Sequence, residues 1–145
     1  MREIVIQSGA VAIRARLLDT PTAEVIWRAL PLFSTVEIWG KEVHFEVPLE
    51  AYLEKDARQF AKLGEIAFSP DGEAISIVYG KTPTTRGKQL RLWSPSNIFA
   101  IAYDDVTAFA SVPVGAEISV RSIGDTSPIE RAHKRRRRAV RRPSA

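Results

Sequence analysis

The sequence predicts a small, mainly β domain with few helices, built as a barrel or a sandwich. Apolar and polar residues alternate along many short segments between residues 3 and 123, and turn-forming residues separate these segments. Alternation with a period of two is what a sheet with one buried and one solvated face requires. Many short strands with few helical segments favour a barrel or a sandwich over a layered α/β fold.

The strands are expected where this alternation is clearest. In KEVHFEV, Val43, Phe45 and Val47 alternate with two glutamates and His44. Similar alternation occurs in 10–17, 66–68, 75–79 and 117–121. The run 98–103 is almost entirely apolar, which indicates a more deeply buried strand. Turns are expected at Ser8-Gly9, Trp39-Gly40 and Asp71-Gly72, because Gly and Asp tolerate positive φ at low cost.

One helix is well marked. Thr20 suits its N-cap, Pro21 its first turn, and Pro31 ends it. Helical spacing places one apolar stripe towards a core, at Ala23, Ile26, Trp27 and Leu30. A weaker apolar pattern predicts a second helix within 49–60, and a short helical turn is expected at 105–111.

Length and composition limit the class of protein. A chain of 145 residues is expected to form one domain that needs no disulfide or metal to hold it together. The chain has no cysteine, which excludes disulfides, thiolate metal sites and a cysteine nucleophile. The N-terminus lacks the apolar core of a signal peptide, so we expect a cytoplasmic protein. We expect no cofactor and no metal.

The charge of the chain is unevenly distributed. Residues 131–145 contain eight of the 21 lysines and arginines and no acid, which leaves 13 bases against all 17 acids in residues 1–130. The main body is therefore mildly acidic, and the high pI comes from the tail. Residues 124–145 hold too few apolar side chains to offset the entropy of ordering them, so we expect a disordered basic tail.

The segment Gly80-Lys81-Thr82 ends like a phosphate-binding loop. Such a loop needs a first glycine five positions before Gly80 and a helix after the threonine. The required position is Ile75, and Pro83 follows the threonine directly. The spacing and the context therefore exclude a nucleotide-binding loop of this class.

Three segments, in order, resemble a known family. They are IWGKEVHFEVP (38–48), LGEIAFSPDGEAISIVYGKTP (63–83) and PSNIFAIA (95–102). Their order, and the Gly-Lys-Thr-Pro run in particular, resemble the small cyclophilin-like proteins of archaea and bacteria. The resemblance covers about residues 3–123 and implies a closed cyclophilin-like β-barrel with one or two short helices. We take residues 1–123 as this domain and residues 124–145 as the tail.

The resemblance implies little about activity, since members of this family are largely uncharacterised. True cyclophilins are peptidyl-prolyl isomerases whose active arginine lies in a Phe-His-Arg segment. Here His44 lies in VHFEV with no arginine beside it, and no later Gln-Phe-Phe segment is present. Prolyl isomerisation is therefore the third of our functional hypotheses, and catalysis of any kind is less expected than binding.

The first hypothesis is non-catalytic binding of a small molecule or peptide by the barrel. The candidate ligand-binding residues are Trp39, Lys81, Thr82, Arg91 and Trp93. Aromatic walls with one lysine and a hydroxyl would suit a small anionic ligand. The alternative is structural, with the tryptophan at the barrel end, the threonine and proline shaping a turn, and the lysine solvated. The segment 81–96 is expected to be a long polar loop.

His44 is the one histidine outside the tail, and it shares a strand face with Glu42 and Glu46. Carboxylates beside a histidine raise its pKa, which would suit acid–base chemistry. We favour a solvated strand face of mixed charge instead. No Gly-x-Ser-x-Gly elbow is present to supply a nucleophile, and the acids are not spaced as metal ligands.

The second hypothesis is an interaction module that holds nucleic acid or another polyanion through its basic tail. The candidate residues are Lys134, Arg135, Arg136, Arg137, Arg138, Arg141 and Arg142. Such a cluster binds phosphates by charge, and without an aromatic residue to stack on bases it does so without sequence specificity.

Overall fold

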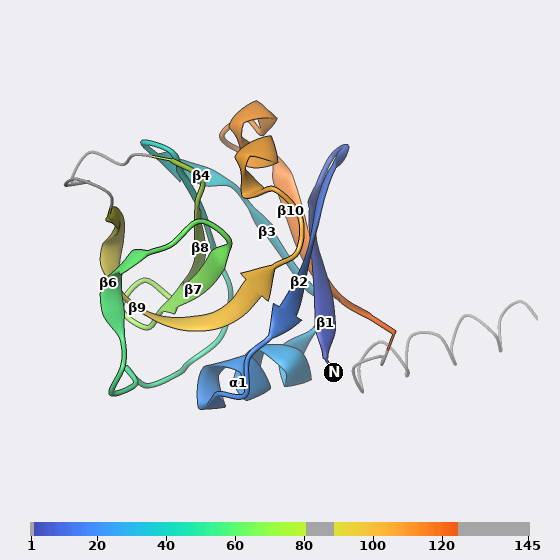
Figure 1. Cartoon of the computed structure of the whole chain (residues 1–145). Helices are drawn as coiled ribbons and strands as arrows, with labels where there is room; N and C mark the ends of the chain where they lie inside the picture. The colour runs from blue at the N-terminus through green and yellow to red at the C-terminus, as the bar shows by residue number, and fades with distance from the viewer. Residues whose placement is uncertain (1, 81–88, 125–145) are drawn as a thin grey trace, which may run out of the picture.

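The computed structural model describes residues 2–80 and 89–124, and these form a mainly β structure (Figure 1). The strands are β1 (Glu3–Ser8), β2 (Val11–Leu17), β3 (Leu32–Thr35), β4 (Glu37–Trp39), β5 (Glu42–Glu46), β6 (Arg58–Ala61), β7 (Glu65–Ser69), β8 (Ala74–Val78), β9 (Leu90–Ala102) and β10 (Glu117–Ile123). The helices are α1 (Pro21–Ala29) and the 3₁₀ helix η1 (Val106–Ser111). No helix of the described ranges is long and apolar enough to cross a membrane.

The strands pair antiparallel in the order β3-β10-β1-β2-β9-β7-β8-β5-β4, and β6 pairs with β9 outside this path. The sheet curls round a core that contains Phe45, Phe68, Phe99 and Phe109. In Figure 1, α1 lies at the lower end of the curled sheet and η1 at the upper end. These two helices bury Ile26 and Trp27, and Val106 and Phe109, respectively.

The predicted closure of the barrel is wrong at one point. The two ends of the sheet, β3 and β4, are joined by Val36 along the chain, and no ladder joins β3 to the neighbouring β5. Across this seam the hydroxyl of Ser34 donates a hydrogen bond of 2.5 Å to the carbonyl of Glu46. An open groove of about 530 Å³ follows the seam between Thr35 and Val47. The structure is therefore an open, barrel-like sheet.

The predicted helix at 21–29 is confirmed, and its start follows from its sequence. The side chain of Thr20 accepts a hydrogen bond from the backbone N–H of Ala23, and Pro21 occupies the first turn. The predicted helical turn at 105–111 is also confirmed, with Asp105 as its N-cap. The hairpin turn at Trp39-Gly40 is confirmed as well, with Gly40 at a φ of 59°.

The predicted helix within 49–60 is wrong. Residues 48–57 form an irregular segment, and 58–61 are strand β6. Asn97, which is buried, fixes this segment: its amide donates to the carbonyl of Tyr52 and to Thr22 Oγ1, and its oxygen accepts from the N–H of Glu54. These long-range bonds use backbone groups that a helix would have used internally.

The prediction of one polar loop over 81–96 is partly wrong. Residues 81–88 lie outside the described ranges, but 90–96 are the first half of β9 and pair with β6. Leu92 is fully buried there in a second, smaller core with Ala61, Ala67 and Val78. Strand β9 therefore belongs to the curled sheet at one end and covers the outer face of β7 and β8 at the other.

Candidate functional site

The candidate site lies on the outer face of β4, β5 and β8. Along β5, Val43 and Phe45 point into the main core, so Glu42 and His44 lie on the opposite face. Residues directly opposite on paired strands share a face. Trp39 and Val78 lie opposite Glu42, and Glu37 and Ser76 lie opposite His44. These six residues are here called the Glu42 face.

The first half of β9 covers this face with the ring of Trp93. The ring stacks on His44, with centroids 5.6 Å apart and an interplanar angle of 28°. Its Nε1–H donates a hydrogen bond of 3.3 Å to the hydroxyl of Ser76. On another side the ring lies against Gly72, where an added Cβ would stand 2.3 Å from two ring carbons. The absence of a side chain at position 72 therefore makes room for Trp93.

Glu42 is the unusual residue of the site. It is 0% exposed, and neither carboxylate oxygen makes a hydrogen bond of good geometry to any described residue. Burial raises the pKa of Glu42, and the imidazole of His44 and the backbone N–H of Trp93 partly oppose this rise. A buried carboxylate without well-formed hydrogen bonds costs about 2–5 kcal/mol, so this arrangement is unfavourable for folding alone.

His44 connects the buried Glu42 to the surface. Its Nε2 lies 3.0 Å from Oε2 of Glu37, whose side chain is 60% exposed, and its Nδ1 lies 3.5 Å from Oε2 of Glu42. If Nε2–H of the neutral ring donates to Glu37, Nδ1 carries no proton. Its lone pair then points towards the carboxylate of Glu42 and repels it. A proton on either Nδ1 or the Glu42 carboxyl removes this repulsion.

The pKa shifts of Glu42 and His44 follow from this geometry. The Glu42 carboxylate raises the pKa of His44 most, burial of the ring opposes it, and Glu37 adds a smaller rise. The pKa values of both Glu42 and His44 are therefore raised, and the pair retains one shared proton to higher pH than either group would alone. The arrangement of carboxylate, imidazole and carboxylate is able to bind a donor and to exchange a proton with solvent.

Three of the five predicted ligand-binding residues lie within the described ranges. Trp39 lies opposite Glu42 on β4, and the ring of Trp93 stacks on His44. Arg91 is on β9, two residues before Trp93, opposite Phe60 of β6. Lys81 and Thr82 lie outside the described residues, as do the predicted polyanion-binding residues Lys134–Arg138, Arg141 and Arg142. The ligand-binding and polyanion-binding roles of all these residues remain predictions.

The interpretation of His44 as part of a solvated strand face is wrong. Its side chain is 15% exposed and that of Glu42 is fully buried, because β9 covers the face that the alternation of β5 marks as polar. Glu46, the third member of that polar row, is exposed as predicted. The signal that was missed is the spacing of Leu90 and Leu92, which are apolar at alternate positions and predict a strand.

An open surface hollow lies elsewhere. An open groove of about 640 Å³ follows β3 and β10, and the guanidinium of Arg121 lies 5.0 Å from the ring of exposed Phe33 there. Its polar side chains face water, so no buried group there calls for a ligand. We favour the Glu42 face, because a buried group without a partner is stronger support for a binding site than open volume.

Comparison with known proteins gives the family. A family model described as cyclophilin-like matches residues 2–121. The chain belongs to the cyclophilin-like family. This confirms the resemblance found in the sequence. No curated protein matches the sequence.

Solved structures agree with a cyclophilin-like fold. The solution structure of the hypothetical protein AF2241 from Archaeoglobus fulgidus is similar, with a TM-score of 0.70 and 25% identity over 82% of this chain and 92% of that one. A structure of McbB in complex with tryptophan has a TM-score of 0.58 and 16% identity. That match covers 85% of this chain and 47% of McbB, and it supports the cyclophilin-like fold alone.

Proposed function

We propose that this cyclophilin-like protein binds a small molecule, without catalysing its conversion, at the Glu42 face. The observation that supports the proposal is the fully buried carboxylate of Glu42, neither oxygen of which makes a hydrogen bond of good geometry to a described residue. Groups held at such a cost are commonly retained for function, because a packed glutamine or apolar residue would stabilise the fold better. A ligand that donates to Glu42 would recover that cost on binding.

The proposal gives each residue a role. Glu42 is the polar anchor, and His44 is the group that gives up or takes the shared proton. Trp93 is 36% exposed and is held by the stack on His44 and the bond to Ser76. A ligand reaches the carboxylate of Glu42 by displacing the ring of Trp93. The ring then covers the bound ligand as an aromatic wall. Trp39, opposite Glu42, is the second wall.

A thermal-shift screen of the full chain tests the proposal. A metabolite at about a hundred times its dissociation constant adds about 2.7 kcal/mol of stability, which raises the melting temperature by several degrees. We expect hits whose stabilisation is lost in Glu42→Gln and retained in Glu46→Gln, the exposed glutamate of the same strand and face. Tryptophan is a reasonable first compound, since McbB has been solved with it. Hits that survive both substitutions would contradict the site.

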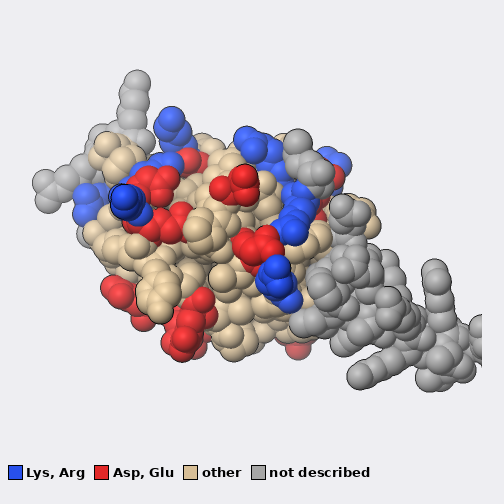
Figure 2. All heavy atoms as spheres, turned by 90° about the horizontal axis from the view of Figure 1, so that it is seen from below, with Lys and Arg blue, Asp and Glu red and all other residues tan. Residues whose placement is uncertain are grey.

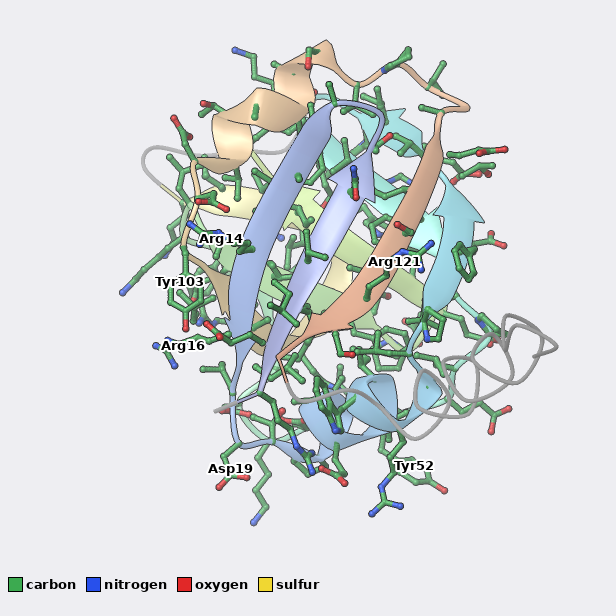
Figure 3. All side chains as sticks on the ribbon, turned by 90° about the vertical axis from the view of Figure 1, so that its right-hand side faces the viewer. Arg14, Arg16, Asp19, Tyr52, Tyr103 and Arg121 are labelled. Atoms are coloured by element: carbon green, nitrogen blue, oxygen red, sulfur yellow. The ribbon has the colours of Figure 1, made fainter. Side chains whose placement is uncertain are left out.

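A second function is favoured by the separation of charge along the chain. We propose that residues 131–145, with eight bases and no acid, bind nucleic acid or another polyanion. The described body is less suited to bind a polyanion. Figure 2 shows acidic and basic side chains interspersed on the face that it presents. On the outer sheet face Arg14 lies beside Tyr103 (Figure 3) and is paired with Asp104 at 3.0 Å. The third function is prolyl isomerisation. The cyclophilin-like fold is its one support, because none of the described residues adds to it.

A further inference from the structure

We infer that the ligand of the Glu42 face is an organic cation, an ammonium or amidinium group attached to a flat ring. The inference rests on the proposed function and specifies the chemistry of its ligand. It departs from the sequence, where Lys81 suggested an anionic ligand.

The charges at the site disfavour an anion. Glu42 and Glu37 lie on adjacent strands of the same face, and His44 lies between them. From β8 the facing residues are Ser76 and Val78, which carry no charge. From β9, Arg91 has interactions of its own, and it is not among the groups that oppose the rise in the pKa of Glu42, which are His44 and the Trp93 amide. An anionic ligand would therefore be placed against two carboxylates.

The missing partner of the site is a donor. Both oxygens of the Glu42 carboxylate lack a hydrogen bond among the described residues, and so does Nδ1 of His44. An ammonium group has up to three N–H donors and an amidinium has four, so either can satisfy both oxygens at once. A metal ion fits less well, because within residues 2–80 and 89–124 no three His, Asp or Glu side chains are placed to hold one ion together.

The rings around the carboxylate favour an organic cation over a simple one. Trp93 and His44 form a stacked pair above Glu42, and Trp39 lies opposite Glu42 on β4. Cations are attracted to the faces of tryptophan rings, and flat rings stack on them. A ligand that combines a charged nitrogen with a flat ring uses both features of the site.

Binding of such a ligand also displaces a proton. Below the raised pKa values of the pair, the site without ligand holds one shared proton on His44 or Glu42, because the lone pair of Nδ1 otherwise faces the carboxylate. The ligand brings its own N–H donors, so the shared proton is no longer needed. It leaves to solvent from Nε2 of His44, which contacts the exposed Glu37. The ligand keeps its protons, and up to one proton is released for each ligand bound.

Three matched probes distinguish the ligand classes: 2-phenylethylamine, 2-phenylethanol and 3-phenylpropionate, with benzamidine as a second cation. Binding to the full chain is followed by NMR at the indole N–H of Trp93 and the ring of His44. We expect the cations to bind at least tenfold more tightly than the alcohol, and the carboxylate to bind more weakly still. Calorimetry in buffers of different ionisation enthalpy should show proton release with the cations.

Substitutions locate the effect. We expect Glu42→Gln to weaken cation binding at least tenfold and to abolish proton release, and Glu46→Gln to leave both unchanged. Glu37→Gln keeps the buried anchor and removes one of the two carboxylates, so it should weaken cation binding less than Glu42→Gln does and reduce proton release. If Glu42→Gln fails to fold, weaker cation binding in Trp39→Phe and reduced proton release in Glu37→Gln still locate binding at this face.

The outcomes separate the ligand class from the site. The inference is overturned if the alcohol or the carboxylate binds as well as the amines while shifting Trp93 and His44, and the proposed site then stands with another ligand. It is also overturned if no amine shifts these two residues. If in addition no hit of the metabolite screen depends on Glu42, the proposed function fails with it.

Discussion

The ring of Trp93 lies against Gly72 so closely that a Cβ at position 72 would stand 2.3 Å from its Cη2 and Cζ2 atoms. Gly72 is in the turn between β7 and β8, and Trp93 belongs to β9, so the contact joins two elements that frame the Glu42 face. The position of the aromatic wall therefore depends on a residue that does not belong to the site.

The first prediction concerns this contact. In Gly72→Ala the added methyl group collides with a rigid ring, so Trp93 must move away from His44 and lose its bond to Ser76. Overpacking of this kind costs about 1–3 kcal/mol. NMR of the Trp93 indole N–H and the His44 ring should show both resonances shifted, and chemical denaturation should show the loss of stability.

Gly80→Ala is the matched control. Its Cβ would meet the side chain of Lys41, with the nearest atom, Cδ, at 2.4 Å. That flexible chain is able to turn aside, so the variant should keep nearly the full stability and leave Trp93 unshifted. If the two glycine variants behaved alike, the contact with Trp93 would not be the cause.

The second prediction concerns the stability of the fold against pH. The pKa of Glu42 is raised in the folded protein, so the folded state binds more protons than the unfolded one above the ordinary value of about 4.5. Stability is therefore lost as pH rises from there through the folded pKa of Glu42. The pKa of His44 is raised too, and its contribution is lost with the same sign as pH rises above 6.5.

Glu42→Gln removes the buried charge, so we expect the variant to be more stable than the parent at pH 8 by about 1–3 kcal/mol. The gain should shrink towards pH 4, where the parent carboxyl is protonated. Melting temperatures measured from pH 4 to 8 check this, with Glu46→Gln as the exposed control. A gain that did not depend on pH would show that the carboxylate is not the group responsible.

The third prediction concerns Asn97. Replacing it with alanine leaves the carbonyl of Tyr52 and the N–H of Glu54 without their partner, at about 2–4 kcal/mol in total. We expect a lower denaturation midpoint and faster amide exchange at Glu54. Gln7→Ala, which removes one exposed bond to Gly9, should change neither. Figure 3 shows Tyr52 extending from the fold, and it is 94% exposed, so its side chain adds little to the cost.

The fourth prediction concerns the tail. Replacing Lys134–Arg138, Arg141 and Arg142 with glutamine should abolish binding to single-stranded RNA and leave the melting temperature unchanged. Contacts to about six phosphates would make the affinity of the unchanged chain fall roughly a thousandfold between low and moderate salt. Fluorescence anisotropy over a salt series measures both. Binding that persisted in the glutamine variant would place the polyanion site in the body.

Much of the fold followed from local pattern. The alternation of Val43, Phe45 and Val47 correctly marked the core face of β5, and Thr20 and Pro21 marked the start of α1. These features follow from the two-residue period of strands and from the open backbone groups at the start of a helix, so neighbouring residues determine them.

The site itself depended on contacts between distant residues. The opposite face of β5 was interpreted as solvated because nothing near His44 in the sequence shows that β9 covers it. The helix expected in 49–60 failed for the same reason, since Asn97 lies some forty residues away from the backbone it fixes. The open seam could not be predicted from local pattern either. The resemblance implied a closed barrel, and whether β3 pairs with β5 depends on residues far apart in the sequence.

Strand β9 carries Trp93 at the site, Asn97 under the 48–57 segment and Phe99 in the main core, within seven consecutive residues. Its far end pairs with β2, whose own place depends on β1 and β10. A fragment that kept only β4 to β9 would lose the strands that hold β9 in register. Assembly of the site therefore requires strands from both ends of the described chain, and its formation reports on the integrity of the domain.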